Sequence, residues 1–222
     1  MFGIFDSGNY LYKLDVSEQL NEKRKAQYEI SRETIEVINT KCHDLRKMIS
    51  STFMKEGIKD GISEITKKLD IYDSIVETDN KALDLVLTEK SLYCENNDIK
   101  LTVIADGAEL DFLSDMDIYS LFGNILDNAV EAVMKVEPQK RHISLSVRSA
   151  GRLVNIHSDN YFDSGGSIRL SDGVPVTTKD DKLNHGYGIL SMKRVVERYD
   201  GVLEISADGD VFNLDIVMTK PL

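Results

Sequence analysis

The stretch Asn124-Ile-Leu-Asp-Asn128-Ala-Val-Glu131-Ala-Val-Met134 lies within a helix that the apolar spacing predicts over residues 115–136. Its two asparagines are four residues apart, so they share one helix face, with Asp127 and Glu131 beside them. Asparagine is a mediocre helix former that is more usual at caps and turns, so a pair in mid-helix needs a reason. The two amides either make solvated or core hydrogen bonds, or form a face that can hold a metal-nucleotide.

The segments around this helix predict an α+β domain with a mixed sheet and helices packed on one face. Between the expected strands and helices, Ala150-Gly151 and Asp208-Gly209 are hairpin signals, and Asp200-Gly201 is a helix stop. Residues 163–185 are rich in Gly, Ser, Asp, Thr and Lys, with too little apolar content to pack, which predicts a functional lid. Apolar periodicity predicts further helices over residues 81–95 and 188–199, and strands over 99–104, 143–147, 153–156, 202–206 and 211–217.

The N-terminal part has a different pattern. Residues 16–53 contain no Pro and no Gly and repeat apolar residues at alternating spacings of three and four, which predicts a coiled-coil helix. After the break at Gly57 to Gly61, the spacing resumes up to Val76, so a second helix can fold back on the first. Such a hairpin buries too little alone, and we expect two copies to form a four-helix bundle in a homodimer. The predicted domains are 1–79, a dimerisation hairpin, and 80–222.

Composition limits the classes of function. The chain has 222 residues, 41% of them hydrophobic, which is enough for a real core. A formal net charge of -11 argues against a nucleic-acid partner, because neutralising phosphates needs clustered Lys and Arg.

Cellular location is indicated by the thiols and by hydropathy. Cys42 and Cys94 are isolated and follow no signal peptide, so we expect no disulfide and a cytoplasmic setting. No apolar run is long enough to span a membrane. A charged helix so near residue 1 would also suit the cytosolic continuation of a removed membrane segment, which is the one membrane connection that the sequence leaves open.

A second candidate element is the glycine-rich entry to the helix after the predicted lid. His185-Gly186-Tyr-Gly188 places two glycines where the backbone N–H groups and the helix dipole can face a phosphate. Glycines at a helix entry can equally serve only to form the turn before the helix, with no ligand. Lys179, Lys182 and Lys193 nearby favour an anion.

In chain order, the asparagine pair is followed by Ile156-His-Ser-Asp159-Asn160, Pro175-Val-Thr-Thr178-Lys179 and His185-Gly186-Tyr-Gly188. Over about residues 25–220, this order resembles the GHKL nucleotide-binding superfamily of gyrase, chaperone, mismatch-repair and histidine kinase domains. Within it, the chain looks like a sensor histidine kinase of the peptide-pheromone receptor type. The resemblance implies a two-layer, Bergerat-type ATP-binding domain after the hairpin, with ATP and Mg as cofactors.

The resemblance also implies roles for individual residues. Asn128 would bind Mg, and Asn124 would line the phosphate side, where the ATPases of the superfamily carry Glu as a base for water. Asp159 would accept a hydrogen bond from the adenine amino group, although the usual Asp-x-Gly-x-Gly reads Asp159-Asn-Tyr-Phe-Asp163 here. The remaining nucleotide-contacting positions would be Asn160, Thr178, Lys179, His185, Gly186 and Gly188.

The phosphoacceptor implied by the resemblance is His43, with Asp44 taking the proton of the imidazole. The phosphoryl group would then pass to an aspartate of a response regulator receiver domain. Relatives carry Asn, Thr or Gln four or five residues after the histidine to orient water for dephosphorylation, whereas this chain has Lys47 and Met48. Kinase activity is thus better supported than phosphatase activity.

Two alternatives remain open. An ATP-hydrolysing switch of the gyrase or chaperone kind would release phosphate without labelling the protein, and Asn124 in place of Glu argues against it. In a degenerate dimeric scaffold, the altered segment after Asp159 would no longer hold ATP.

Overall fold

The structure is a computed structural model, and it describes residues 19, 22–23, 25–34, 76–163, 170–171, 174–175 and 187–221. The elements of the C-terminal region alternate between helices and strands. The helices are α3 (Lys81–Asn96), η2 (Gly107–Leu110), α4 (Asp115–Val133), η3 (Pro138–Lys140) and α5 (Tyr187–Arg198). The strands are β1 (Lys100–Ala105), β2 (His142–Ala150), β3 (Leu153–Tyr161), β4 (Leu170–Ser171), β5 (Val174–Pro175), β6 (Val202–Asp208) and β7 (Val211–Thr219).

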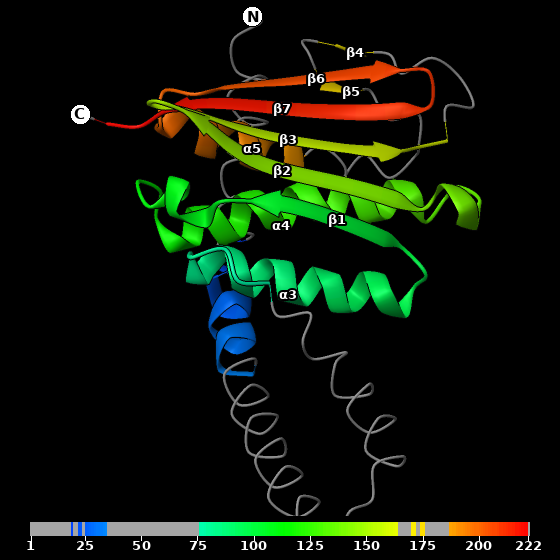
Figure 1. Cartoon of the computed structure of the whole chain (residues 1–222), viewed down its shortest axis with the longest axis horizontal. Coiled ribbons are helices and arrows are strands. Elements are labelled where there is room, and N and C mark those ends of the chain that lie inside the picture. Colours follow the sequence, from blue (N-terminus) through cyan, green and yellow to red (C-terminus); the bar gives the residue numbers. More distant parts are fainter. Residues whose placement is uncertain are drawn as a thin grey trace, which may run out of the picture.

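Five of these strands form one mixed sheet in the order β1-β2-β3-β7-β6 (Figure 1). Strand β1 pairs parallel with β2, and every other neighbouring pair in this sheet is antiparallel. Because α4 connects the end of β1 to the start of the parallel strand β2, it must run back across the sheet, in the same direction as β3. By the same reasoning, α5 runs opposite to α4, since it leads into β6, which is parallel to β3.

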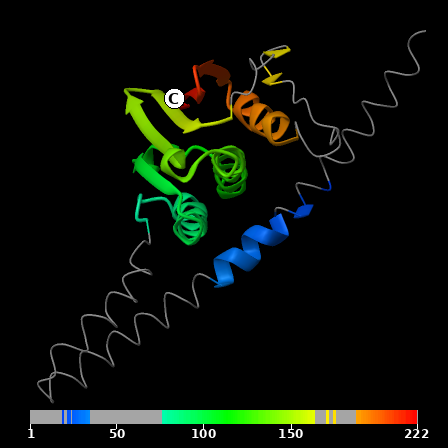
Figure 2. The ribbon, with the colours of Figure 1, turned by 90° about the vertical axis from the view of Figure 1, so that its right-hand side faces the viewer.

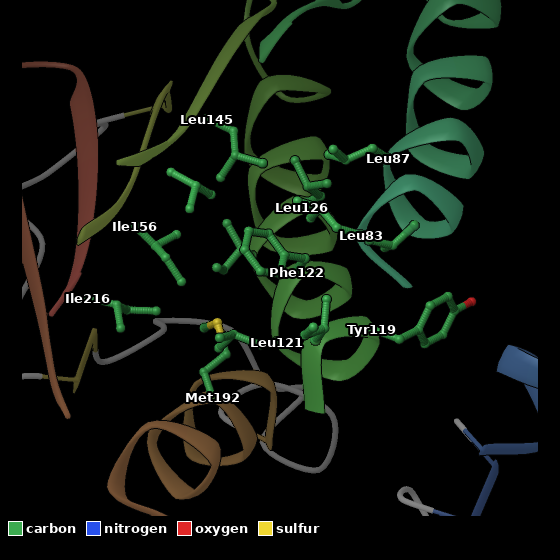
Figure 3. Packing of buried hydrophobic residues seen from close by; sticks show 14 of the residues in the cluster. Leu83, Leu87, Tyr119, Leu121, Phe122, Leu126, Leu145, Ile156, Met192 and Ile216 are labelled. Carbon is green, nitrogen blue, oxygen red and sulfur yellow. The ribbon is translucent and has the colours of Figure 1, made fainter. Parts of the chain in front are cut away.

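The helices α3, α4 and α5 cover one face of the sheet, and the other face is open (Figure 2). Along β2 and β3, buried and more exposed residues alternate, as expected for strands with one covered face. In Figure 3, α4 lies between sheet residues such as Ile156 and residues of α3 such as Leu83, while Met192 of α5 packs beside Leu121. Full burial of each such side chain contributes about 1.5–3 kcal/mol to folding.

Local signals in the sequence set the helix ends. The side chain of Asn80 accepts a hydrogen bond from the backbone N–H of Leu83 at the start of α3, and Ser114 Oγ accepts one from Asp117 at the start of α4. After α5, Asp200 adopts a positive φ of 51°, and Gly201 follows. Asp200 and Gly201 therefore end the helix as the sequence predicted.

Residues 25–34 are helical and contact the domain at one place. The ring of Tyr28, which is only 6% exposed, packs edge-on against that of Tyr119 at a centroid distance of 5.1 Å. Tyr119 donates a hydrogen bond to Glu89 Oε2 at 2.8 Å, and Ser31 donates to the same oxygen at 3.3 Å. The first predicted helix therefore contacts both α3 and α4.

The prediction of an α+β fold with a mixed sheet covered on one face is confirmed. Every helix and strand predicted from residue 80 onward is present, although β3 continues to Tyr161, five residues beyond its predicted end. The short pair β4 and β5 was not predicted. The two-helix hairpin beyond residue 34 lies outside the described residues and stays a prediction, as does the domain boundary at residue 79. Among the described residues, no helix combines the length and hydropathy needed to cross a lipid bilayer.

Candidate functional site

The two asparagines of α4 lie one turn apart toward the helix layer, as their spacing predicted. Asn124 is 2% exposed, and its Nδ2 donates a hydrogen bond to the carbonyl of Ser120 at 2.7 Å. Only an amide nitrogen can face a carbonyl oxygen, so this bond also defines which atom of Asn124 is Oδ1. Asn128 is half-buried on the next turn.

The entry of α5 comes directly against these amides. A Cβ atom built on Gly188 would lie 3.2 Å from Asn124 Oδ1 and 3.4 Å from Asn128 Oδ1. Any larger residue would therefore crowd both carboxamides, which gives Gly188 a packing reason as well as a conformational one. Two segments separated by about sixty residues thus meet at one point, with two amide oxygens and the first turn of a helix.

The carboxylates beside the asparagine pair are directed elsewhere. Asp127 Oδ1 forms an ion pair with Lys90 Nζ of α3 at 2.8 Å, and Glu131 pairs with Lys135 one turn later at 2.6 Å. Burial lowers the pKa of Lys90, but Asp127 and Glu89 more than offset this and leave that pKa above its ordinary value. Asp127 therefore ties α4 to α3.

Asp159 and Asn160 lie on opposite faces of the sheet, because successive side chains of a strand alternate. Asp159 Oδ2 lies 3.5 Å from Nε2 of His157, whose Nδ1 lies 2.8 Å from Asp215 Oδ1 on the neighbouring strand. Asn160 is 4% exposed, in the same alternating set as the core residue Ile156. The structure thus brings Asn160, and not Asp159, to the side of the sheet that carries the helices.

The chemistry of this site fits a magnesium-bound phosphate. Mg²⁺ takes hard oxygen ligands, keeps several waters and needs few protein groups, so amide oxygens such as those of Asn124 and Asn128 suit it. Among the described residues, no group of three or more His, Cys, Asp or Glu could hold a metal ion by itself. A metal at this site would therefore need the ligand's own oxygens as well.

The region that contains this site is similar to a known protein family. Residues 113–219 match the family model of the GHKL domain. The match begins just before α4 and ends with β7, so it includes the asparagine pair, Asn160 and Gly188.

The solved structures that match this chain include three histidine kinases, each with a TM-score below 0.5. The catalytic domain of histidine kinase ThkA has a TM-score of 0.49 and 13% identity, with 64% of this chain and 95% of that chain covered. The mycobacterial sensor histidine kinase MprB has a TM-score of 0.43 and 14% identity, covering 63% and 92%. The histidine kinase domain from the blue-light activated histidine kinase EL346 of Erythrobacter litoralis has a TM-score of 0.44 and 15% identity, covering 92% and 94%. No curated protein matches the chain in a sequence comparison.

A polar network joins the start of α4 to the end of α5, where Asp117 is buried and the Arg198 side chain is 58% exposed. Arg198 Nη1 donates to both carboxylate oxygens of Asp117, at 2.6 and 2.8 Å, and the hydroxyl of Tyr199 donates to Oδ2 at 2.7 Å. Ser114 Oγ, the cap of α4, also donates to Oδ2 at 2.7 Å. The sequence analysis did not single out these residues, although Ser114-x-x-Asp117 is a recognisable capping pattern.

Only some of the remaining predicted residues belong to the described part of the chain. His142, beside Thr102 Oγ1 at 3.2 Å, lies on β2, and His157 lies on β3. The predicted acceptor pair and several nucleotide-contacting positions lie outside the described residues: His43, Asp44, Thr178, Lys179, His185 and Gly186. Their roles stay predictions.

Proposed function

We propose that this chain is the dimerisation and ATP-binding region of a sensor histidine kinase, in which ATP and Mg²⁺ bind among α4, α5 and the sheet of the GHKL domain. The observation that carries the proposal is the meeting of Gly188 with Asn124 and Asn128 inside that domain. Asn128 would bind the metal ion, Asn124 would line the phosphate side, and the entry of α5 would offer backbone N–H groups to phosphate. Bound Mg²⁺ would neutralise charge that develops on the phosphates during transfer.

Asn124 favours phosphoryl transfer over hydrolysis. A carboxamide is not a base, and Nδ2 of this one is occupied by the carbonyl of Ser120, so Asn124 cannot take a proton from water. The phosphoryl group then remains available to a protein acceptor, for which we propose His43. Its imidazole nitrogen would form the N–P bond while the bond from the γ-phosphorus to the oxygen of ADP breaks, and Asp44 would accept the proton from the other ring nitrogen.

The finer parts of this proposal follow from the resemblance described above. The hairpin of residues 1–79 would form a four-helix bundle with a second copy. The phosphoryl group would pass from His43 to an aspartate of a response regulator, in the manner of the peptide-pheromone receptor kinases. Because these steps use cellular ATP, the region would act in the cytoplasm.

The test uses the whole chain and ATP labelled in the γ-phosphate. His43→Ala should abolish labelling of the protein but leave nucleotide binding intact, whereas the control His157→Ala, on the open face of the sheet, should keep its label. Label that persists in His43→Ala would refute the acceptor assignment. Release of phosphate without any protein labelling would favour the ATP-hydrolysing switch instead.

Nucleotide binding is tested separately by calorimetry with a non-hydrolysable ATP analogue and Mg²⁺. Asn128→Ala should remove the part of the affinity that depends on Mg²⁺. The matched control is Asn96→Ala, because Asn96 is also a helical asparagine but lies on the exposed end of α3. A wild-type chain that binds no nucleotide would refute the proposed function and favour a scaffold.

A further inference from the structure

The contact between the helix of residues 25–34 and the rest of the chain is small. Tyr28 is its one buried residue, and Ser31 is half-buried. The Tyr28 ring meets the edge of the Tyr119 ring at a centroid distance of 5.1 Å, and Ser31 Oγ donates to Glu89 Oε2 at 3.3 Å. A stable protein interface buries about 800 Å² on each partner, so a contact built on one tyrosine can open and close.

The surface that receives this helix is formed by α3 and α4 alone. The hydroxyl of Tyr119 donates to Glu89 Oε2 at 2.8 Å, and Glu89 Oε1 accepts a hydrogen bond from Lys90 Nζ at 3.3 Å. In Figure 3, the Tyr119 ring points away from the core residues toward the helix of residues 25–34. The ring and the charged acceptor are therefore held in place before the helix docks on them.

Tyr28 and Ser31 also begin the apolar repeat that predicts a coiled coil. Alternating spacings of three and four lead from them to Ile35 and Ile38 and on to residue 52. In a coiled coil, the residues of such a repeat face the partner helix and form the seam between the two helices. The residues from 35 to 52 lie outside the described part of the chain, so this seam stays a prediction.

The docked contact and the seam need the same helix face. Packed helices lie with their axes about 8–10 Å apart, so a partner helix on the face of Tyr28 leaves no space there for α3 and α4. A Tyr28 ring that is packed against Tyr119 is likewise lost to the seam. The two arrangements at residues 28–31 are therefore alternatives.

We propose that Tyr28 and Ser31 have two mutually exclusive partners: the surface of Tyr119 and Glu89 in their own chain, and the matching helix face of a second copy. Pairing of two copies at residues 28–31 releases α3 and α4 from the helix, and docking in turn weakens the dimer, because coupling between two binding events is reciprocal. This inference rests on the homodimer proposed above and adds the contact that opposes it.

The residue types suit a contact that can change partners. Stable seams are built from Ile, Leu and Val, whereas the first two seam positions here are a tyrosine and a serine. In an apolar seam, the Ser31 hydroxyl would lose water without gaining a strong acceptor, but in the docked helix it donates to a carboxylate. Releasing residues 28–31 therefore costs the seam little, and the later positions, with Ile35 and Ile38, still pair.

The experiment measures dimerisation of the whole chain by sedimentation equilibrium while only the docking surface is changed. Tyr119→Leu removes the ring that meets Tyr28, and Glu89→Gln removes the charge that Ser31 contacts. Loss of one such contact should weaken docking about five-fold. Both copies must undock before they pair, so the dissociation constant of the dimer should fall by up to about 25-fold, the square of that factor. The control Glu197→Gln, on the exposed face of α5, should leave it unchanged.

A second readout follows residue 31 itself. Ser31→Cys, combined with Cys42→Ser, places a thiol on the predicted seam, and mild oxidation should join two copies only when both helices are undocked and paired. Cys94 is buried and does not compete. Adding Tyr119→Leu should increase the cross-linked fraction. The matched control replaces Ser31→Cys with Glu33→Cys, on an exposed side of the helix away from the seam, and Tyr119→Leu should leave its cross-linking unchanged.

Each outcome either supports or overturns the inference. A dimer whose dissociation constant stays the same or rises in both Tyr119→Leu and Glu89→Gln would overturn it, since neither residue belongs to the seam. Glu89→Gln keeps the size of the side chain, so this comparison does not depend on whether Tyr119→Leu folds. In that case the wild type still dimerises and the proposed function stands. A wild type that is monomeric at every concentration would instead refute the homodimer, and with it the inference.

Discussion

Gly188 provides the sharpest test of the site, because the structure gives the consequence of adding one carbon atom. A Cβ at this position would lie 3.2 Å from Asn124 Oδ1, which is tight enough that the neighbouring atoms must move by a few tenths of an ångström, and 3.4 Å from Asn128 Oδ1, where ordinary contact begins. Asn124 has little room to move, since it is buried and its Nδ2 is bonded to the carbonyl of Ser120. The entry of α5 should therefore shift, and Asn128, which is half-buried, should adjust with it.

Stability and binding should respond differently to Gly188→Ala. In a helix, Ala is favoured over Gly by about 0.5–1 kcal/mol, which offsets the tight contacts, so the free energy of unfolding should change by less than about 0.5 kcal/mol. Mg²⁺ requires near-ideal octahedral geometry, and a displaced Asn128 Oδ1 would weaken a ligand contact. We expect the affinity for ATP with Mg²⁺ to fall about ten-fold, which corresponds to about 1.4 kcal/mol.

The assay is calorimetry with the ATP analogue, with and without Mg²⁺, alongside urea denaturation. Gly188→Val should reduce the affinity further, because its two methyl groups extend beyond the Cβ toward the amides. Glu197→Ala is the matched control, since Glu197 is an exposed residue of the same helix. Wild-type affinity in Gly188→Val would show that the ligand does not lie against these amides, and the site as built would be refuted.

Three further outcomes follow from buried groups. Asp117→Asn should lower the free energy of unfolding in urea by about 2 kcal/mol, since it weakens charge-assisted bonds from Arg198 and its neighbours; a loss below about 0.5 kcal/mol would contradict this. Burial, with help from Glu89, raises the pKa of Tyr119 from 10.0 to about 12. The protonated hydroxyl of Tyr119 therefore contributes fully to the free energy of unfolding below pH 10, and this contribution is lost as the pH rises toward 12. Tyr119→Phe should flatten the fall in unfolding free energy over this range, and an unchanged slope would exclude Tyr119 as its source. Burial likewise raises the pKa of the Cys94 thiol to about 11, so peptide mapping should find it alkylated slowly at pH 8 in the native chain and rapidly in urea.

Much of the domain could be predicted because its signals are local. Asn80 and Ser114 precede apolar-periodic segments and cap them, and Asp200-Gly201 ends α5 as expected. The asparagine pair was expected to share one face on spacing alone. That Gly188 would meet this face followed only from the resemblance, since no local rule relates a helix entry to a residue sixty positions earlier.

The faces of Asp159 and Asn160 could have been predicted but were not. Val154 and Ile156 alternate with Asn155 and His157, and extending this period of two assigns Asn160 to the core face. The predicted strand ended at Ile156, where the apolar residues stop, so the alternation was not carried into the polar residues that follow. Hydropathy does not show that a polar residue at a strand end is buried. At such a position, the face of the sheet follows from counting alternate residues along the strand.

Ion pairs between distant segments could not be predicted at all. Lys90 with Asp127 and Arg198 with Asp117 are each defined by how two helices pack, and charged residues on helices are far more often solvated. Only the packed helices show that Asp127, which the sequence placed beside the metal-binding face, is directed toward α3 instead.

The Asp117 network has a consequence for the nucleotide site, because α4 and α5 are antiparallel and contact each other along their lengths. Gly188 and Arg198 are ten residues apart on α5, and Asp117 and Asn128 are eleven residues apart on α4, so the two spans are about 15 and 16.5 Å at 1.5 Å per residue. Because these two spans are nearly equal, the ion pair between Arg198 and Asp117 at one end of the helix pair places Gly188 against the amides of α4 at the other end. A slide of α5 by a single residue, about 1.5 Å, would move Gly188 by several times the displacement that a Cβ requires of the amides. Asp117→Asn should therefore weaken binding of ATP with Mg²⁺ even though Asp117 lies about 16.5 Å along α4 from Asn128, the proposed metal ligand.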